Sequence, residues 1–193
     1  MNNPTKIILF DADGVLIRSN SWSSEYIHRK NLPKWVMGDF FAGIFQECAT
    51  GQADLKSILP PFLKEWKWGW SVDDFLNEWF QFENKPDHEL ISKIQELRKE
   101  GIKCYVATNQ EKYRLAFTRE VMKFSEYFDG IFCSAEIWLK KPQKEYFEHI
   151  LTSLGVSPDK VAYFDDSEEN IQVASSLWIQ ARLYRNISDF HID

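Results

Sequence analysis

The stretch that most constrains the fold of this chain begins at Ile7 and ends at Leu16. Its first four residues are apolar and lead directly into Asp11 and Asp13, after which Gly14 turns the chain. A continuous apolar run bounded by turn residues is typical of a strand that is buried on both faces of a parallel sheet. Ligands of open α/β sheets bind at the carboxyl ends of the strands. The two acids therefore lie at a predicted ligand-binding edge, where they repel each other unless a cation or a proton intervenes.

The residues from about 18 to 85 differ in composition from the rest of the chain. They contain six of the eight tryptophans and no run of β-branched residues. Apolar side chains recur at helical spacing between Trp35 and Phe45, and Ser71 with Asp74 predicts a capping box at the start of a helix. We expect a small all-helical insert at residues 18–85, placed directly after the first strand. Residues 1–17 and 86–193 are then expected to form the core domain.

After residue 86, predicted strands and helices alternate to the end of the chain. Strands are expected at 103–107, 130–133, 161–164 and 181–184, with amphipathic helices between them. Gly101 and Gly155 suit the position just after a helix. This alternation predicts an α/β fold with a Rossmann-like parallel sheet, right-handed crossovers and helices on both faces.

Polar side chains follow three of these strands, and the carboxyl ends of parallel strands meet at the same edge of a sheet. The residues are Asp11, Asp13, Thr108, Asn109, Asp165 and Asp166. Four carboxylates at one edge require a cation, and all-oxygen ligands favour Mg²⁺. Lys141 follows another predicted strand and adds a positive charge on the same side. A metal with lysine, threonine and asparagine donors describes a phosphate-binding site.

Each of these elements has a simpler explanation when it is taken singly. Asp13 and Gly14 could form a turn, and Thr108 could cap a helix. Lys141 beside Lys140 could be a solvated surface pair. The four histidines have no spacing typical of metal ligands. Only the combination of the motifs favours a site.

Taken in order, the motifs resemble those of the haloacid dehalogenase-like (HAD) superfamily. The matching segments are Asp11-Ala12-Asp13-Gly14-Val15-Leu16, Thr108-Asn109, Lys141-Pro142 and Asp165-Asp166-Ser167-x-x-Asn170. The resemblance covers essentially the whole chain, because the helical insert lies where the α-helical cap of subfamily I is found. It implies the HAD fold with such a cap.

The resemblance also implies a Mg²⁺-dependent phosphatase acting on a small phosphomonoester. Asp11 would be the nucleophile and would carry the phosphoryl group as an aspartyl-phosphate. Asp13 would protonate the leaving alcohol and then deprotonate the attacking water. Lys141 would offset charge at the nucleophile and, with Thr108 and Asn109, would hold the phosphoryl oxygens.

The same resemblance implies the metal ligands. Asp11, Asp166 and the backbone carbonyl of Asp13 would bind Mg²⁺ directly, and Asp165 would act directly or through water. Dehalogenases of the superfamily generally lack the second aspartate of the first motif, so Asp13 favours phosphoryl chemistry. Two alternatives stay open, a sugar-phosphate mutase of the same superfamily and a non-catalytic binding protein that keeps the fold.

Two positions depart from the family pattern. Trp138 and Trp178 stand where members usually carry glycine, shortly before the lysine and after the last helix. Tryptophan disfavours the left-handed backbone conformation that glycine adopts freely. We therefore predict that the helix ending near Leu177 terminates without a left-handed residue at Trp178.

Bulk properties of the sequence argue against several kinds of partner. The net charge of −6 argues against a nucleic acid or an anionic membrane as the main partner. The apolar runs are too short to span a bilayer, and the first residues lack the apolar region of a signal peptide. Three cysteines without paired spacing suit a reducing compartment. We expect a cytoplasmic monomer that acts on a small phosphorylated metabolite.

Overall fold

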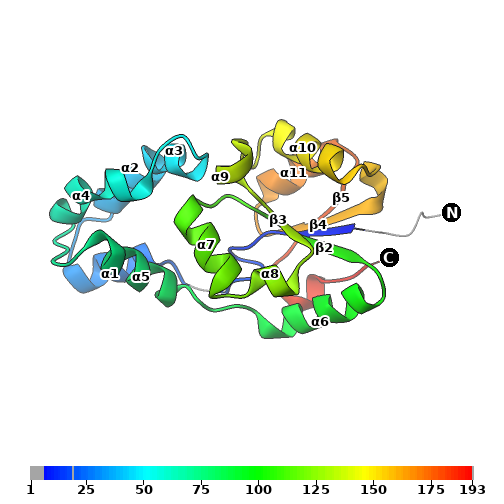
Figure 1. Ribbon diagram of the computed structural model, residues 1–193, viewed down its shortest axis with the longest axis horizontal. Coiled ribbons are helices and arrows are strands. Elements are labelled where there is room, and N and C mark those ends of the chain that lie inside the picture. The colour runs from blue at the N-terminus through cyan, green and yellow to red at the C-terminus, as the bar shows by residue number, and fades with distance from the viewer. Residues whose placement is uncertain (1–6, 19, 193) are drawn as a thin grey trace.

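A five-stranded parallel sheet forms the centre of the protein (Figure 1). The computed structural model describes residues 7–18 and 20–192. The strands are β1 (Ile7–Phe10), β2 (Lys103–Thr108), β3 (Gly130–Cys133), β4 (Val161–Asp165) and β5 (Gln180–Leu183). Their order is β3-β2-β1-β4-β5, so the chain moves outward from β1 to β3 and then returns to the other side of β1. The junction between β1 and β4 is therefore the topological switch point, where such sheets bind ligands.

Helices cover both faces of the sheet, as the alternating pattern predicted. On one face, Ile8 and Phe10 of β1 share a core with α6 (His88–Lys99) and α8 (Phe124–Tyr127). On the other face, Ile7 and Leu9 share a core with α10 (Lys144–Leu154) and α11 (Glu168–Ser176). All four residues of β1 are buried, which confirms the expected central strand. The α/β class and the Rossmann-like sheet are likewise confirmed.

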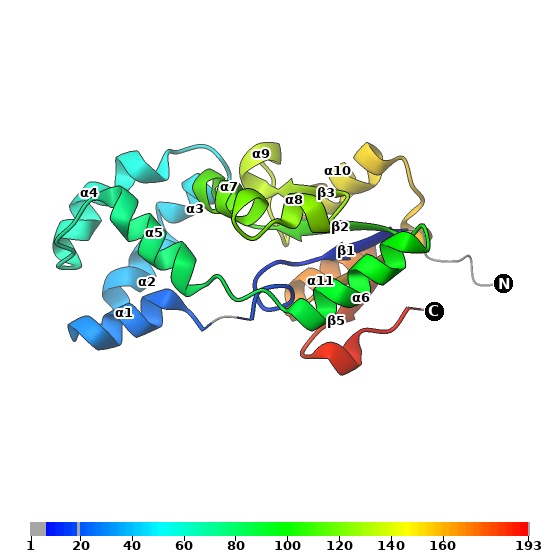
Figure 2. The same cartoon turned by 60° about the horizontal axis from the view of Figure 1, so that its bottom comes forward.

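Shorter elements complete this part of the chain. They are α7 (Lys112–Glu120), α9 (Ser134–Ile137) and the 3₁₀ helices η1 (Pro158–Lys160) and η2 (Ile187–Asp189). Helix α7 follows β2 and extends from the sheet toward the helices of the first half of the chain (Figure 2).

Among the described residues between β1 and α6 there are five helices, and we refer to them as the helical group. They are α1 (Trp22–Lys30), α2 (Trp35–Ala42), α3 (Phe45–Ala49), α4 (Leu55–Glu65) and α5 (Val72–Phe82). The group has an aromatic core of its own that includes Trp22, Tyr26, Phe40, Trp66 and Phe75. The predicted capping box of Ser71 and Asp74 opens α5. The helical group lies beyond the carboxyl end of β1 (Figure 1).

The two connections between the helical group and the sheet run side by side. The amide of Arg18 donates to the carbonyl of Lys85 at 2.9 Å, and the amide of Asp87 donates to the carbonyl of Leu16 at 2.8 Å. The chain therefore leaves and re-enters the α/β part at one place.

The prediction for Trp178 was wrong. Its φ is +67°, and that of Trp138 is +60°, so both adopt the left-handed conformation. At the end of α11, the amide of Trp178 donates to Ser175, and the next amide, of Ile179, donates to Ala174. This left-handed turn buries Ile179 against the sheet, while the Trp178 ring stays 82% exposed. Burial of the following residue therefore outweighs the backbone preference of tryptophan.

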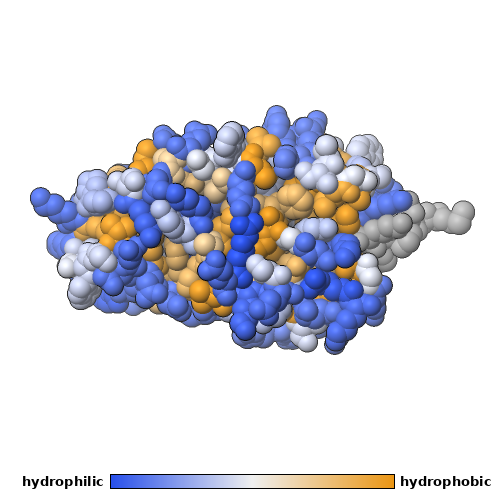
Figure 3. All heavy atoms as spheres, in the orientation of Figure 1, coloured by the Kyte–Doolittle hydropathy of each residue, from blue (hydrophilic) through white to orange (hydrophobic). Residues whose placement is uncertain are grey.

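On the face shown in Figure 3, hydrophobic residues occur in patches between hydrophilic ones, over the helical group and over the α/β part alike. None of the helices formed by residues 7–18 and 20–192 is long and apolar enough to cross a bilayer.

The left-handed conformation at Trp178 predicts an unusual order of stability for two variants at this position. Trp178→Gly should be more stable than Trp178→Ala by about 1 kcal/mol, because only glycine adopts positive φ without steric cost. The measurement is urea unfolding of both variants. His149, an exposed residue within α10, is the control, since there glycine should be less stable than alanine by about 1 kcal/mol. The same order at both positions would contradict the argument.

Candidate active site

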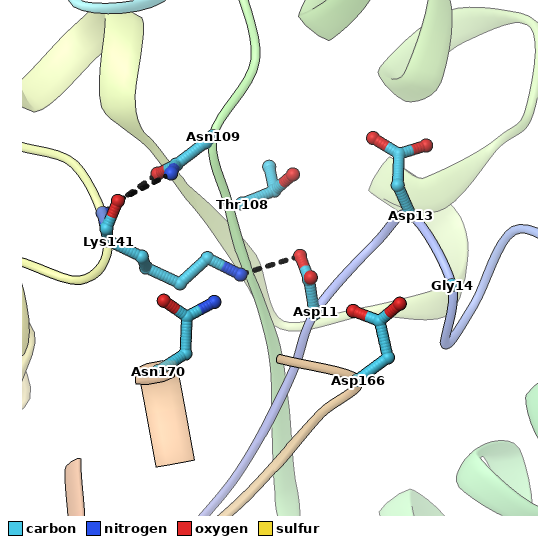
Figure 4. A pocket seen from close by; sticks show the side chains of 8 residues that line it. All are labelled: Asp11, Asp13, Gly14, Thr108, Asn109, Lys141, Asp166 and Asn170. Atoms are coloured by element: carbon cyan, nitrogen blue, oxygen red, sulfur yellow. Dashed lines mark hydrogen bonds and ion pairs between the residues drawn. The ribbon is translucent and has the colours of Figure 1, made fainter. Parts of the chain in front are cut away.

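The predicted site residues meet in a pocket at the carboxyl ends of β1, β2 and β4 (Figure 4). The pocket has a volume of about 410 Å³. It is lined by Asp11, Asp13, Gly14, Thr108, Asn109, Lys141, Asp166 and Asn170. Asp165, the remaining predicted residue, lies fully buried at the end of β4 and contacts Lys141. The fold thus brings together residues that are up to 159 positions apart.

The ammonium group of Lys141 is the electrostatic centre of the pocket. Its Nζ lies 2.7 Å from Oδ1 of Asp11 and 2.8 Å from Oδ2 of Asp165, and the lysine side chain is only 2% exposed. Although burial disfavours its charge, the two carboxylates raise the pKa of Lys141. A charge buried this deeply is tolerated only because both partners are in contact with it.

The two carboxylates that share Lys141 differ in their proton affinity. Burial raises the pKa of Asp11 to about 8, and Lys141 offsets this only in part. Burial acts in the same direction on Asp165, but Lys141 and other donors hold the pKa of that carboxyl below its usual value. Asp165 ionises readily, and its negative charge then disfavours ionisation of Asp11, as expected for two carboxyls that share one site.

The side chain of Asp165 is saturated by donors from the protein. It accepts hydrogen bonds from the amide of Ser167 at 2.8 Å and from Nδ2 of Asn170 at 3.0 Å. The hydroxyl of Tyr163 also donates to it. Because these bonds hold Asp165 in place, its ion pair also fixes the position of the Lys141 ammonium.

Asp166 has the opposite character, since its carboxylate is exposed to the pocket. It lies beside Gly14, which has a φ of +84°, and a Cβ at Gly14 would overlap the Asp166 carboxylate. Partial burial and the nearby charge of Asp165 raise the pKa of Asp166. Asp11, Asp165 and Asp166 each offer an oxygen within 4.8 Å of the other two. This is a donor set of the kind that a hard divalent cation prefers.

Thr108 and Asn109 lie at the end of β2 and line the pocket. Thr108 is its last residue and is buried. The side chain of Asn109 forms two hydrogen bonds with the backbone of Lys141: Nδ2 donates to the carbonyl at 2.8 Å, and Oδ1 accepts from the amide at 2.9 Å. Asn109 therefore fixes the loop that carries the lysine, a role that the sequence did not indicate.

Asp13 stands on the far side of the pocket from Lys141 (Figure 4). Its side chain is 57% exposed, and Oδ1 lies 3.8 Å from Nη2 of Arg114. Nε2 of Gln110 donates to Oδ2 at 3.3 Å. Sequence reasoning missed both neighbours. Gln110 directly follows Asn109, so its position offered a signal, whereas nothing in the sequence indicates that the charged Arg114 is buried.

The comparisons with known proteins define the class. A family model described as haloacid dehalogenase-like hydrolase matches residues 5–177. The chain therefore belongs to this family and is a hydrolase, as its motifs indicated.

Three similar proteins illustrate the range of the family. The sesquiterpene phosphatase astK of Aspergillus oryzae is 32% identical over 93 residues, which are 48% of this chain and 47% of that protein. This chain thus matches about half the length of that relative. The phosphoglycolate phosphatase of Aquifex aeolicus is 24% identical over 96% of this chain and 91% of its own. A HAD family enzyme of Bacteroides thetaiotaomicron, solved as a magnesium complex, superposes with a TM-score of 0.80 at 22% identity, covering 94% of each chain.

The close approach of Gly14 to Asp166 predicts a selective loss of function. Gly14→Ala and Gly101→Ala both place a side chain at positive φ, which should lower the free energy of unfolding by about 1–2 kcal/mol in each. A Cβ at Gly101 meets no atom within 4 Å, so only Gly14→Ala should displace a pocket carboxylate and reduce turnover, by about 100-fold. Thermal unfolding and hydrolysis of p-nitrophenyl phosphate measure the two effects. Equal turnover in both variants would contradict this reading of the pocket.

Proposed function

We propose that the protein is a Mg²⁺-dependent phosphatase that hydrolyses a small phosphomonoester through an aspartyl-phosphate intermediate. The observation that carries the proposal is the pairing of a lysine-bound carboxylate with a second, exposed carboxylate across one pocket. Asp11 is held at the end of β1 by Lys141, whereas Asp13 projects from the following turn. Such a pair can divide the work of nucleophile and proton carrier.

The reaction follows in two balanced steps. An oxygen of Asp11 attacks phosphorus, the bond from phosphorus to the leaving oxygen breaks, and Asp13 gives that oxygen its proton. Water then attacks the same phosphorus and passes a proton to Asp13, while the bond to Asp11 breaks and inorganic phosphate leaves. Lys141 offsets the charge of the phosphoryl oxygens, and Thr108 and Asn109, which line the same pocket, hold these oxygens. Positioning and charge compensation are the main requirements of phosphoryl transfer.

The acidic cluster suits the metal that the proposal requires. Asp11, Asp166 and the backbone carbonyl of Asp13 would hold Mg²⁺, and Asp165 would act through Lys141 because its oxygens already accept donors from the protein. The ion would supply positive charge to the phosphoryl group and relieve the repulsion among the acids.

We also propose that residues 18–85 form a cap and that 1–17 with 86–193 form the catalytic core. Two contacts support a cap position above the pocket. Nζ of Lys140, next to the pocket lysine, donates to Oε1 of Gln46 in α3 at 2.6 Å. The hydroxyl of Ser134 donates to the carbonyl of Ala49. A cap held there would exclude bulk water and select the leaving group. We expect a small phosphorylated metabolite as substrate and a monomeric, cytoplasmic enzyme.

Substitution of the nucleophile tests the proposed reaction. Wild-type protein should release p-nitrophenol and phosphate from p-nitrophenyl phosphate with Mg²⁺ present and lose this activity in a chelator. Asp11→Asn keeps the shape of the side chain but removes the nucleophile, so turnover should fall at least about 1,000-fold. Asp39→Asn, at an exposed acid of α2, is the control and should stay active. Undiminished turnover in Asp11→Asn would refute the assignment, and transfer to a second sugar hydroxyl would identify a mutase.

The raised pKa of Asp11 predicts how magnesium affinity depends on pH. Because burial raises the pKa of Asp11 to about 8, Mg²⁺ binding competes with protonation of this carboxyl, and its apparent affinity should increase as pH rises from 6 to 8. One displaced proton corresponds to at most about tenfold per pH unit. Calorimetric titration with MgCl₂ measures this slope, which should vanish in Asp11→Asn and persist in Asp39→Asn. An affinity of wild-type protein that is flat over this range would contradict the prediction.

A further inference from the structure

Arg114 of α7 is a buried cation outside the set of predicted site residues. Its side chain is 5% exposed, and its guanidinium lies over the rings of Phe80 and Phe117, 5.3 and 5.7 Å from their centroids. Nη1 donates to the carbonyl of Phe80 at 3.2 Å. Nη2 is also buried but has no hydrogen-bond partner among the described residues. Burial of a charge is unfavourable unless its donors are matched, so this nitrogen calls for a physical explanation.

Nη2 lies between two carboxylates, one from the turn after β1 and one from the end of the helical group. It is 3.8 Å from Oδ1 of Asp13 and 3.5 Å from Oε2 of Glu83. Both distances are within ion-pair range but are too long for a good hydrogen bond. A small rotation of either carboxylate would complete the bond, so Arg114 is placed to bind one of them at a time or both weakly.

Glu83 fixes the guanidinium on the side of the helical group. It follows the last residue of α5, and its Oε1 accepts from the amide of Trp22 at the start of α1 at 2.9 Å. Its Oε2 accepts from Nε1 of Trp79 at 2.9 Å. Glu83 thus joins the first and last helices of the group, and Arg114 connects that junction to the pocket.

Gln110 holds the other oxygen of Asp13. Besides its bond to Asp13, it accepts from the hydroxyl of Thr118 in α7 at 3.2 Å. The amide of Gln110 donates to the hydroxyl of Ser134 at 3.1 Å. Two buried side chains therefore approach the exposed carboxyl of Asp13 from the protein side and leave its outer face to the pocket.

We propose that Arg114 is a positioning residue for Asp13. In this proposal, the ion pair with Glu83 holds the Arg114 guanidinium between the helical group and Asp13. Arg114 aims the carboxyl at the leaving oxygen and does not itself contact the phosphoryl group. The inference rests on the proposed function, since it assumes that Asp13 delivers a proton. The structural alternative is that Arg114 only packs against Phe80 and Phe117.

The two roles differ in how the rate depends on the leaving group. A misdirected acid fails to protonate the departing oxygen, and this failure slows an ester more when its alcohol is a stronger base. p-Nitrophenolate leaves readily without a proton, whereas phenolate leaves poorly. Loss of packing alone would slow both esters alike, because it does not discriminate between the leaving oxygens.

Arg114→Met tests the proposal, because methionine keeps apolar contact with the two rings. We expect kcat/KM, which reports only the steps up to departure of the leaving oxygen, to fall less than about tenfold for p-nitrophenyl phosphate but about 100-fold for phenyl phosphate. Arg119→Met is the matched control on the same helix. Its guanidinium binds Glu136 at 2.6 and 2.8 Å, away from Asp13, so both rates should stay at the wild-type level.

The outcomes separate this inference from the proposed function. Wild-type protein that cleaves neither ester with Mg²⁺ would refute the proposed function itself. Active wild-type protein with equal losses of kcat/KM on both esters in Arg114→Met, or with no loss of kcat/KM, would overturn the positioning role. If Arg114→Met fails to fold, Arg114→Lys retains the charge but not the fork of donors, and it should show the same selective loss at a smaller size. Equal losses on both esters in that variant would also overturn the proposal.

Discussion

The ammonium of Lys141 between Asp11 and Asp165 is the interaction on which the rest of the site depends. A charge that is 98% removed from solvent cannot remain there without partners, and the fold supplies them from separate elements. The order of strands places β4 directly beside β1, so the carboxylates that end these two strands flank one cation. Asn109 then fixes the loop of Lys141 through two backbone hydrogen bonds. The position of Asp11 beside Lys141 is therefore a consequence of sheet topology.

Much of the fold was accessible from the sequence because its signals are local. The apolar run before Asp11 needed burial on both faces and became the central strand, and the capping box of Ser71 and Asp74 opened α5 as expected. The polar residues at the strand ends converged because parallel strands share one edge. Their order along the chain was the second signal, since each motif alone had a simple alternative. Asp11, Lys141 and Asp166 illustrate how the convergence of distant residues in one pocket can be predicted from the sequence.

The features that escaped prediction depend on packing between distant segments. Trp178 is left-handed because Ile179 must reach the sheet, and no property of tryptophan itself signals this. Arg114 carries a charge and lies on a short helix, so sequence alone favours an exposed position. Its burial follows from Phe80, which belongs to the helical group and lies 34 residues away in the chain. Such contacts appear only once the two parts of the chain are placed together.

Asp11 and Asp13, the two aspartates of the first motif, are held by different parts of the molecule. Asp11 continues a strand that is hydrogen-bonded on both sides, with its amide donating to Phe164 at 2.9 Å. Asp13 lies on the turn beyond it and pairs with Ile17, which in turn pairs with Pro86 at the base of the helical group. The surroundings of Asp13 therefore include the base of the helical group, whereas Asp11 is held by the neighbouring strand and by Lys141. In the proposed reaction, the nucleophile would thus be held by the sheet, and the proton carrier would be held at the boundary with the helical group.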